Sequence, residues 1–304
     1  MYNFVKNYFI VNWKGRNLVK FTNRTLRIIK NAEFEAKKTT NIVYPIHLFL
    51  SMTQEKTGVC AEVNMYNPYL SEILNERFMA LYTTNHEIGM VYEPFTINIS
   101  TSTLQVLEIA NSRMKRFNQI FINEGHLADA IFRSDDLLTR LLFEGLEVEN
   151  IIGILCNPRD MLVSLKNYSV SIDLIDGINF RKAEQGDQTT LKKFVESEFG
   201  KGWLNSIENG FLLEEIPIYI AVDNEQILGF ACYDLVRGRK GIFGPMGTSF
   251  SNRVQGIGTT LLHLCLKEMK ELGHEYAIIG EAGPLEFYEK ACGAVVIPKT
   301  ININ

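Results

Sequence analysis

The chain has little excess charge of either sign. It carries 31 basic and 35 acidic side chains, which give a formal net charge of −4 at pH 7. A surface without a strong field of one sign attracts neither nucleic acid nor an anionic membrane, because both are bound through dense opposite charge. We therefore expect neither nucleic acid nor a membrane among the partners of this protein.

Long apolar runs and paired cysteines are also missing. No stretch approaches the roughly 20 apolar residues that a membrane-spanning helix needs. The first residues, MYNFVKNYFIVNW, are interrupted by lysine and asparagine and lack the cleavage site of an export signal. The five cysteines are scattered, without the short paired spacings of a zinc site or a disulfide framework. These absences predict a cytoplasmic protein that holds no metal.

The length of the chain favours two domains. Single domains usually contain roughly 100 to 200 residues, whereas this chain has 304. The spacing of apolar residues changes after Asn157-Pro158, from a helical period to strands that alternate with helices. We therefore predict a helical domain at residues 1–166 and an α/β domain at residues 167–304.

An internal repeat is visible in the first half. Residues 25–32 return as residues 103–110, and His47-Leu48 returns as His126-Leu127. Both copies begin with apolar residues on one helical face. Thr22 can cap the first helix, and Thr101 or Ser102 the second. Further helices are expected at residues 46–53, 69–82, 124–132, 136–143 and 148–155. The first half is thus predicted to be an all-α double repeat.

These repeats resemble the amino-terminal domain of the Clp unfoldases over residues 20–155. In that family a Gly-Thr-Glu-His-Leu-Leu stretch opens the second helix of each repeat. Here the stretches read Tyr-Pro-Ile-His-Leu-Phe at 44–49 and Asn-Glu-Gly-His-Leu-Ala at 123–128, so the histidines are kept and the acid before them is replaced. The resemblance implies a docking module for a peptide or protein partner, and the lost acid argues against the phosphoarginine binding known in the family.

His47 and His126 allow a structural and a functional interpretation. A histidine near a helix start usually makes a structural hydrogen bond, whereas a metal or catalytic role needs further ligands or partners. No Cys, Asp or Glu recurs beside the histidine in both copies. We favour the structural interpretation.

A loop with two glycines opens a long helix in the second half. The loop reads SNRVQGIGTT at 251–260, after a strand expected at residues 241–248. Glycine lets the backbone approach a ligand, and the first helical turn offers N–H groups and a positive dipole end to an anion. The third glycine of a dinucleotide fingerprint and the Gly-Lys-Ser/Thr of a triphosphate loop are absent. The loop predicts a phosphate site of another class.

The segment from Arg253 to Gly258 resembles the signature of the GNAT superfamily of N-acetyltransferases. That signature is Gln or Arg, two residues, Gly, one residue, and Gly or Ala. The predicted order of elements agrees: a strand, two helices, three antiparallel strands, this loop and its helix, a strand, a helix and a last strand. The resemblance implies an α/β acyl-CoA N-acyltransferase fold with a mixed, mainly antiparallel sheet, which transfers acetyl from acetyl-CoA to an amine.

The resemblance also implies roles for particular residues. The residues expected to bind acetyl-CoA are Met246, Gly247, Thr248, Arg253, Val254, Gln255, Gly256, Ile257, Gly258 and Thr259. Tyr288, in a segment like the family's Phe-Tyr-x-Lys, is expected to protonate the departing thiolate. Glu281 is the expected base, with Asp234 and Glu215 as weaker candidates. Water chains replace a side-chain base in many members of this family.

Two other functions stay open at this point. A second domain that binds acetyl-CoA without turnover is a sensor, and a Clp-like first domain also fits an adaptor for proteolysis. The acceptor is not identified by the sequence, although the region of residues 203–213 is expected to line its site. Thiol release from acetyl-CoA in the presence of amines separates the enzyme from the sensor.

Overall fold

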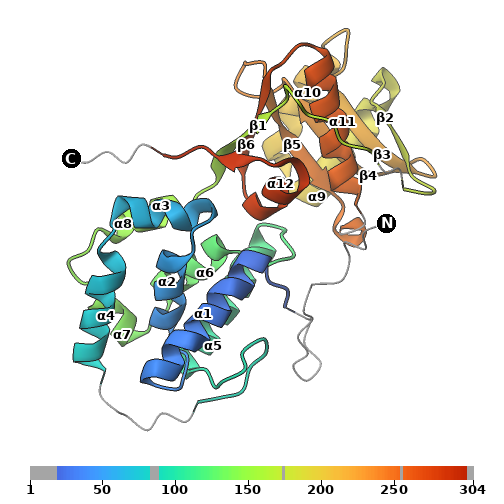
Figure 1. Cartoon of the computed structure of the whole chain (residues 1–304). Helices are drawn as coiled ribbons and strands as arrows, with labels where there is room; N and C mark the ends of the chain where they lie inside the picture. The colour runs from blue at the N-terminus through green and yellow to red at the C-terminus, as the bar shows by residue number, and fades with distance from the viewer. Residues whose placement is uncertain (1–18, 83–88, 173–174, 254–255, 300–304) are drawn as a thin grey trace. The chain divides into compact units, whose positions relative to one another are not determined.

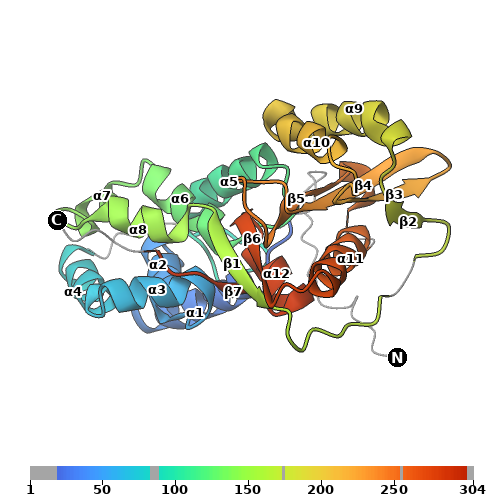
Figure 2. The same ribbon diagram turned by 90° about the horizontal axis from the view of Figure 1, so that it is seen from above.

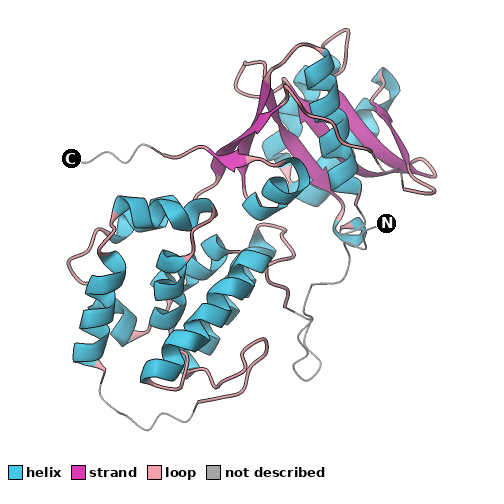
Figure 3. Cartoon of the chain, viewed as in Figure 1, coloured by secondary structure: helices cyan, strands magenta, loops and turns pink. Residues whose placement is uncertain are grey.

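The computed structural model shows two compact units, and it describes residues 19–82, 89–172, 175–253 and 256–299. One unit comprises residues 1–157 with 298–304, and the other comprises Pro158–Ile297. The described part of the first unit is helical, whereas the second contains a sheet flanked by helices (Figures 1 and 3). The predicted fold class, a helical half followed by an α/β half, is confirmed.

The helices of the first unit follow one another with short connections. They are α1 (Asn23–Thr39), α2 (Pro45–Gln54), α3 (Gly58–Tyr66), α4 (Leu70–Leu81), α5 (Thr101–Arg116), α6 (Glu124–Arg133), α7 (Leu137–Leu142) and α8 (Val148–Leu155). Helix α3 is not predicted from the sequence, because its residues GVCAEVNMY are mostly weak helix formers. Val59, Cys60 and Val63 are buried there, because α3 packs against α2 and α8. Tertiary packing therefore sets this helix.

The repeat has a reciprocal structural counterpart. Phe21, before α1, forms a parallel bridge with Ile122, and Val43, before α2, forms one with Ile99. The Thr22 hydroxyl accepts the Thr25 N–H and caps α1, as predicted. The cap of α5 is Ser100 and not Thr101 or Ser102, because Ser100 keeps the extended backbone that lets its hydroxyl accept the Thr103 N–H.

A seven-stranded sheet forms the centre of the second unit. Its strands are β1 (Arg159–Ser164), β2 (Asn179–Lys182), β3 (Ile218–Asp223), β4 (Gln226–Tyr233), β5 (Ile242–Thr248), β6 (Tyr276–Ala282) and β7 (Val295–Val296). Their order is β2-β3-β4-β5-β6-β1-β7. Within the described residues only β5 and β6 pair in parallel, and the other neighbours are antiparallel. The sheet is mixed and mainly antiparallel, as predicted.

Strand β1 belongs to the second unit, so the boundary between the units lies before it. The sequence interpretation assigned residues 159–166 to the helical domain, but β1 lies between β6 and β7 and pairs with both. Met161 and Val163 are buried on one face, while Leu162 on the other face is exposed, so that burial alternates along the strand although Leu162 is apolar. The division at Asn157 and Pro158 therefore replaces the one drawn at residue 166.

Helices cover both faces of the sheet (Figure 2). One face carries α9 (Gln188–Phe199) and α10 (Leu204–Phe211), and the other carries α11 (Ile257–Glu271) and α12 (Leu285–Cys292). Short 3₁₀ helices lie at Gln185–Asp187, Lys201–Trp203 and Phe250–Asn252. The α9 side is packed with Leu191, Val195 and Phe230, all fully buried. Burial of such side chains contributes about 1.5–3 kcal/mol each and holds the layers together.

Candidate active site

Strands β5 and β6 separate partway along their length. Their parallel pairing is confined to Ile242 with Ile278 and Phe243 with Ile279. Both strands continue further, β5 to Thr248 and β6 to Ala282. A gap therefore opens beside the second half of β5, as expected from the resemblance to acetyltransferases.

The backbone of β5 presents hydrogen-bonding groups to this gap. The Ser249 N–H donates to Leu228 O across to β4, at 2.9 Å. Because peptide groups alternate in direction along a strand, those of Thr248 and Met246 face the opposite edge. Thr248 O accepts a bond from Arg253 Nε at 3.2 Å, in agreement with that direction. The Met246 N–H is thus directed into the gap.

Helix α11 begins directly after the predicted glycine loop. Gly256 is its N-cap residue, with a φ of 91° that side-chain-bearing residues rarely adopt. The Thr260 N–H makes the first intrahelical bond, to Gly256 O. The N–H groups of Ile257, Gly258 and Thr259 precede that bond and have no acceptor within the helix. This geometry suits an anion at the helix start.

Gly258 lies where three elements meet. A methyl group built on it would lie 3.8–3.9 Å from Thr248 of β5, Met246 of β5 and Phe287 of α12. These are ordinary contact distances, so the position tolerates a methyl group. A longer side chain would extend toward Thr248, Met246 and Phe287. The end of β5, the start of α11 and the first turns of α12 therefore share one location.

Arg253 braces the turn between β5 and α11. In addition to its bond to Thr248 O, its guanidinium lies over the Phe250 ring, 5.4 Å from the centroid. Burial lowers the pKa of the Arg253 side chain. The geometry gives Arg253 a role in shaping the loop. Val254 and Gln255, also expected to bind acetyl-CoA, lie outside the described residues.

Tyr288 lies beside the base of the gap. Its ring contacts Phe243, the last β5 residue that pairs with β6, at a centroid distance of 6.3 Å, and Phe287 at 4.9 Å. The residue is buried, and burial raises the pKa of its hydroxyl well above the usual value. A phenol with a raised pKa keeps its proton at neutral pH, which a general acid requires.

Glu281 has a different environment from Tyr288. It is the penultimate residue of β6 and has a φ of 49°. Its side chain is 76% exposed and lies 3.2 Å from Arg237. Arg237 also binds both carboxylate oxygens of Asp160. Asp160 in turn accepts the Glu281 N–H. The Glu281 carboxylate is therefore part of a solvated ion pair at the strand end.

The two weaker base candidates have structural or solvated surroundings. The Asp234 carboxylate accepts the Gly241 N–H at 2.6 Å and lies 3.1 Å from His274 Nε2, which fixes the β4–β5 turn. The Glu215 side chain is 89% exposed and lies 3.9 Å from Lys182. Neither contact links these carboxylates to the gap.

Several residues at the site come from distant segments that the sequence did not identify. The Phe199 ring, at the end of α9, lies directly against the backbone of Gly247, and Trp203 packs on it at 5.1 Å. Glu198 accepts the Phe250 N–H at 3.0 Å. Ile175 would touch a methyl group on Gly256 at 3.5 Å. No local motif marks these residues, since only the fold brings them to the loop.

The histidines of the first unit make the structural bonds that were expected. His47 Nδ1 accepts the Tyr44 N–H at 2.9 Å, and His126 Nδ1 accepts the Asn123 N–H at 3.2 Å. Burial lowers the pKa of each imidazole to about 4. Both rings are therefore neutral at pH 7 and close the start of their helices.

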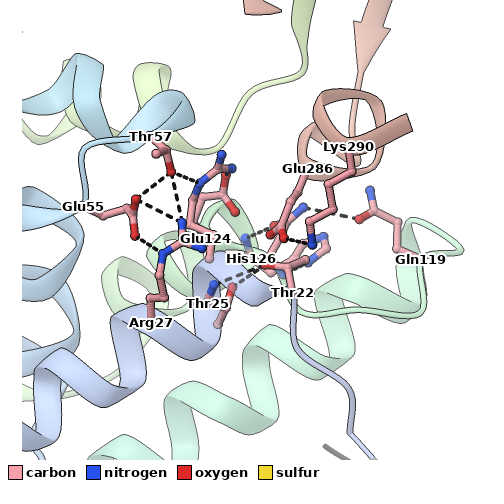
Figure 4. A network of polar contacts seen from close by, with 12 residues as sticks. Thr22, Thr25, Arg27, Glu55, Thr57, Gln119, Glu124, His126, Glu286 and Lys290 are labelled. Carbon is pink, nitrogen blue, oxygen red and sulfur yellow. Dashed lines mark hydrogen bonds and ion pairs between the residues drawn. The ribbon is translucent and has the colours of Figure 1, made fainter. Parts of the chain in front are cut away.

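A buried polar network lies next to these helix starts (Figure 4). The Arg24 guanidinium contacts Glu124 at 2.5 Å, and both side chains are 3% exposed. Arg24 also donates to Thr57, whose hydroxyl donates to Glu55, and Glu55 is paired with Arg27. Glu124, the acidic residue in the stretch that contains His126, is thus paired with Arg24 of the same unit.

The described ranges contain no group of three or more His, Cys, Asp or Glu side chains placed to hold a metal ion. Within those same ranges, no helix has the length and apolar character needed to cross a membrane.

Comparison with known proteins assigns a family to part of the second unit. Residues 188–294 match the family model described as Acetyltransferase (GNAT) family. The chain therefore contains a GNAT acetyltransferase domain, and it lies in the unit that holds the strand gap and the glycine loop. No curated protein matches the chain.

Solved structures resemble parts of the chain. A GCN5-related N-acetyltransferase from Sphaerobacter thermophilus aligns with 46% of this chain and 49% of its own length, with 21% identity and a TM-score of 0.39. The N-terminal domain of the chaperone ClpD from Arabidopsis thaliana aligns with 44% and 94%, with 20% identity and a TM-score of 0.34. An aminoglycoside N-acetyltransferase in complex with CoA aligns with 43% and 98%, with 14% identity and a TM-score of 0.34. The chain thus spans about half the length of the first of these structures.

Proposed function

We propose that the second unit transfers an acetyl group from acetyl-CoA to an amine. The observation that carries this proposal is the opening of β5 and β6 next to a helix that begins at a glycine. A thioester needs room between strands, and a pyrophosphate needs uncommitted N–H groups. The gap and the start of α11 offer both within one site.

The residues present fit the parts of acetyl-CoA in order. The N–H groups of Ile257, Gly258 and Thr259 would receive the pyrophosphate, and the open edge of β5 would pair with the pantetheine arm. The Met246 N–H would then donate to the acetyl carbonyl. A donor aimed at the developing oxyanion lowers the barrier by about 3–4 kcal/mol. Arg253, which is also expected to contact acetyl-CoA, and Phe199 would border this path.

Two protons move in the reaction. The amine nitrogen attacks the carbonyl carbon, the C–N bond forms, the C–S bond breaks, and the nitrogen loses a proton while the sulfur gains one. We assign proton donation to Tyr288, because its raised pKa keeps it protonated. Glu281 remains the proposed base, acting directly or through water from the end of β6.

Thiol release tests the activity. Purified chain, acetyl-CoA and a panel of amines, including diamines, amino sugars and peptides with free N-termini, should release CoA thiol above the rate of hydrolysis with at least one amine. If saturating binding of acetyl-CoA is measured and no amine raises thiol release, the sensor replaces the enzyme. An adaptor that does not bind acetyl-CoA at all would show neither signal.

The role of Glu281 has a matched test. Glu281→Gln should lower kcat at pH 7 and recover in part at higher pH, where more of the amine is already unprotonated. Arg237→Gln breaks the same ion pair and leaves the carboxylate in place. Equal effects of the two variants would mean that only the ion pair matters and that water serves as the base.

We propose separately that the helical unit docks a peptide or protein partner. Support comes from its two reciprocal repeats and their resemblance to Clp amino-terminal domains. Residues 1–157 can serve as bait and residues 158–304 as control on the same support. A partner retained by the control as well, or by neither fragment, contradicts the proposal.

A further inference from the structure

A cavity lies on the outer side of α11, away from its first turn. Its volume is about 450 Å³, and it is enclosed by α11 and by the connection between β1 and β2. His263, Lys267, Lys270 and Glu271 line the helical wall. Their spacing of four, seven and eight residues from the first places them on one stripe of the helix. The cavity therefore lies between one face of α11 and the segment that connects β1 to β2, called here the crossing segment.

The crossing segment is fixed on α11 by two polar contacts. The Tyr168 hydroxyl and His263 Nδ1 are hydrogen-bonded at 2.5 Å, and Lys270 Nζ donates to Tyr168 O at 2.7 Å. His263 is buried, and burial lowers the pKa of its imidazole. Since His263 is uncharged at neutral pH, it adds hydrogen-bonding capacity to the wall without adding charge.

The charge of the lining is positive. Lys270 bonds a neutral carbonyl, so its ammonium charge is not balanced by that contact. Lys267 lies 3.9 Å from Glu271, and both side chains are more than 60% exposed, which makes this a weak, solvated pair. Ser169 adds a hydroxyl, while Val170 and Ile172 add apolar surface. Two cations, one acid and an apolar wall suit a small anion with a short apolar body.

We propose that this cavity binds a small organic anion, a carboxylate or a phosphate monoester, at a site separate from that of acetyl-CoA. Lys267 follows Thr259 by eight residues, which corresponds to about 12 Å along the helix axis. The proposed pyrophosphate site uses the first turn of α11, whereas the cavity uses the later turns. The lining also includes Tyr168, Ser169, Val170 and Ile172, which precede the segment matched to the acetyltransferase family. The site therefore does not depend on the proposed transfer reaction.

Phenyl phosphate is a suitable probe because it combines an anion with a small apolar body. Its binding to the full chain is measured by isothermal titration and by ligand-observed NMR, with benzyl alcohol as the uncharged control. We expect saturable binding of phenyl phosphate and none of benzyl alcohol. Lys267→Ala combined with Lys270→Gln should weaken binding about tenfold or more, since each lost charged hydrogen bond removes a substantial part of the affinity.

Controls separate this site from general effects. Lys193→Ala removes an exposed lysine from α9 and should leave binding of phenyl phosphate unchanged. Thermal unfolding of each variant shows whether the fold is kept, and Tyr168→Phe supplies a second variant of the lining that retains both lysines. Absence of saturable binding, equal affinity of the double variant and the parent, or displacement of phenyl phosphate by CoA would each overturn the proposal.

Discussion

Three helices of the helical unit and helix α11 of the second unit start in different ways. In the helical unit, side chains of the chain itself receive the first-turn N–H groups: Thr22 for α1, Ser100 for α5 and Asn123 for α6. In the second unit, α11 starts at Gly256, which has no side chain to do so. First-turn N–H groups are thus bound by side chains in those three helices, and the corresponding groups of α11 are the ones proposed to bind the pyrophosphate.

The largest expected effect comes from placing an acid at the open helix start. Gly256→Asp should weaken CoA binding roughly 1000-fold, because like charges brought together cost several kcal/mol. Gly273→Asp is the control, since Gly273 has a similar φ of 93° beyond the end of α11 and open space around it. Calorimetry should show that only the first variant loses affinity, and unchanged affinity of Gly256→Asp would refute the assigned phosphate site.

The buried histidines at the starts of α2 and α6 should make the stability of the helical unit depend on pH. The pKa of His47 and of His126 is about 4 in the folded chain and about 6.5 when unfolded. The folded state therefore has its full stability above pH 6.5, where both imidazoles are neutral in either state. The free energy of unfolding falls as the pH is lowered from 6.5 to 4, because the histidines of the unfolded chain take up protons first. Since one pKa unit corresponds to about 1.4 kcal/mol, each histidine accounts for a loss of up to roughly 3 kcal/mol in the free energy of unfolding.

Denaturant unfolding of the full chain between pH 7 and pH 4 measures this loss. Replacement of both histidines by glutamine should flatten the pH dependence while lowering stability at pH 7. If the profile of the double variant keeps its slope, other groups must carry the pH dependence, and the histidines do not close their helices as neutral rings.

Tyr288→Phe should separate chemistry from binding at the open site. We expect kcat for acetyl transfer to fall about 100-fold, the lower range for loss of a general acid, with CoA affinity unchanged. Tyr276→Phe, which removes an exposed hydroxyl from β6, serves as the control. Equal rates for Tyr288→Phe and the parent enzyme would leave protonation of the sulfur to water.

The smallest effect is expected at a single cap of the helical unit. Ser100→Ala should lower the free energy of unfolding by about 1 kcal/mol and leave acetyl transfer unchanged. Ser112→Ala on the same helix removes an exposed hydroxyl that bonds Glu108 O and should be nearly neutral. Thermal unfolding of both variants gives the comparison, and a larger loss for Ser112→Ala would contradict the assignment of the cap.

Sequence reasoning succeeded where the determining residues are neighbours in the chain. The loop at 253–259 could be interpreted because a strand, glycines and a helix follow one another, and the repeat was visible because it recurs. Helix α3 and strand β1 were missed because tertiary contacts, and not periodicity, define them. At the site, Phe199 and Ile175 could not be anticipated, because each reaches the loop through the folded path of a separate segment.

Strand β1 also determines where this protein can be divided. A fragment that begins at residue 167 would lack β1, so that the outer edge of β6 would lose its partner and β7 would lose the strand it pairs with. An uncovered strand edge recruits other chains and promotes aggregation. A fragment that begins at Pro158 keeps the sheet closed on that side, so insolubility of the shorter piece would say nothing about the acetyltransferase fold itself.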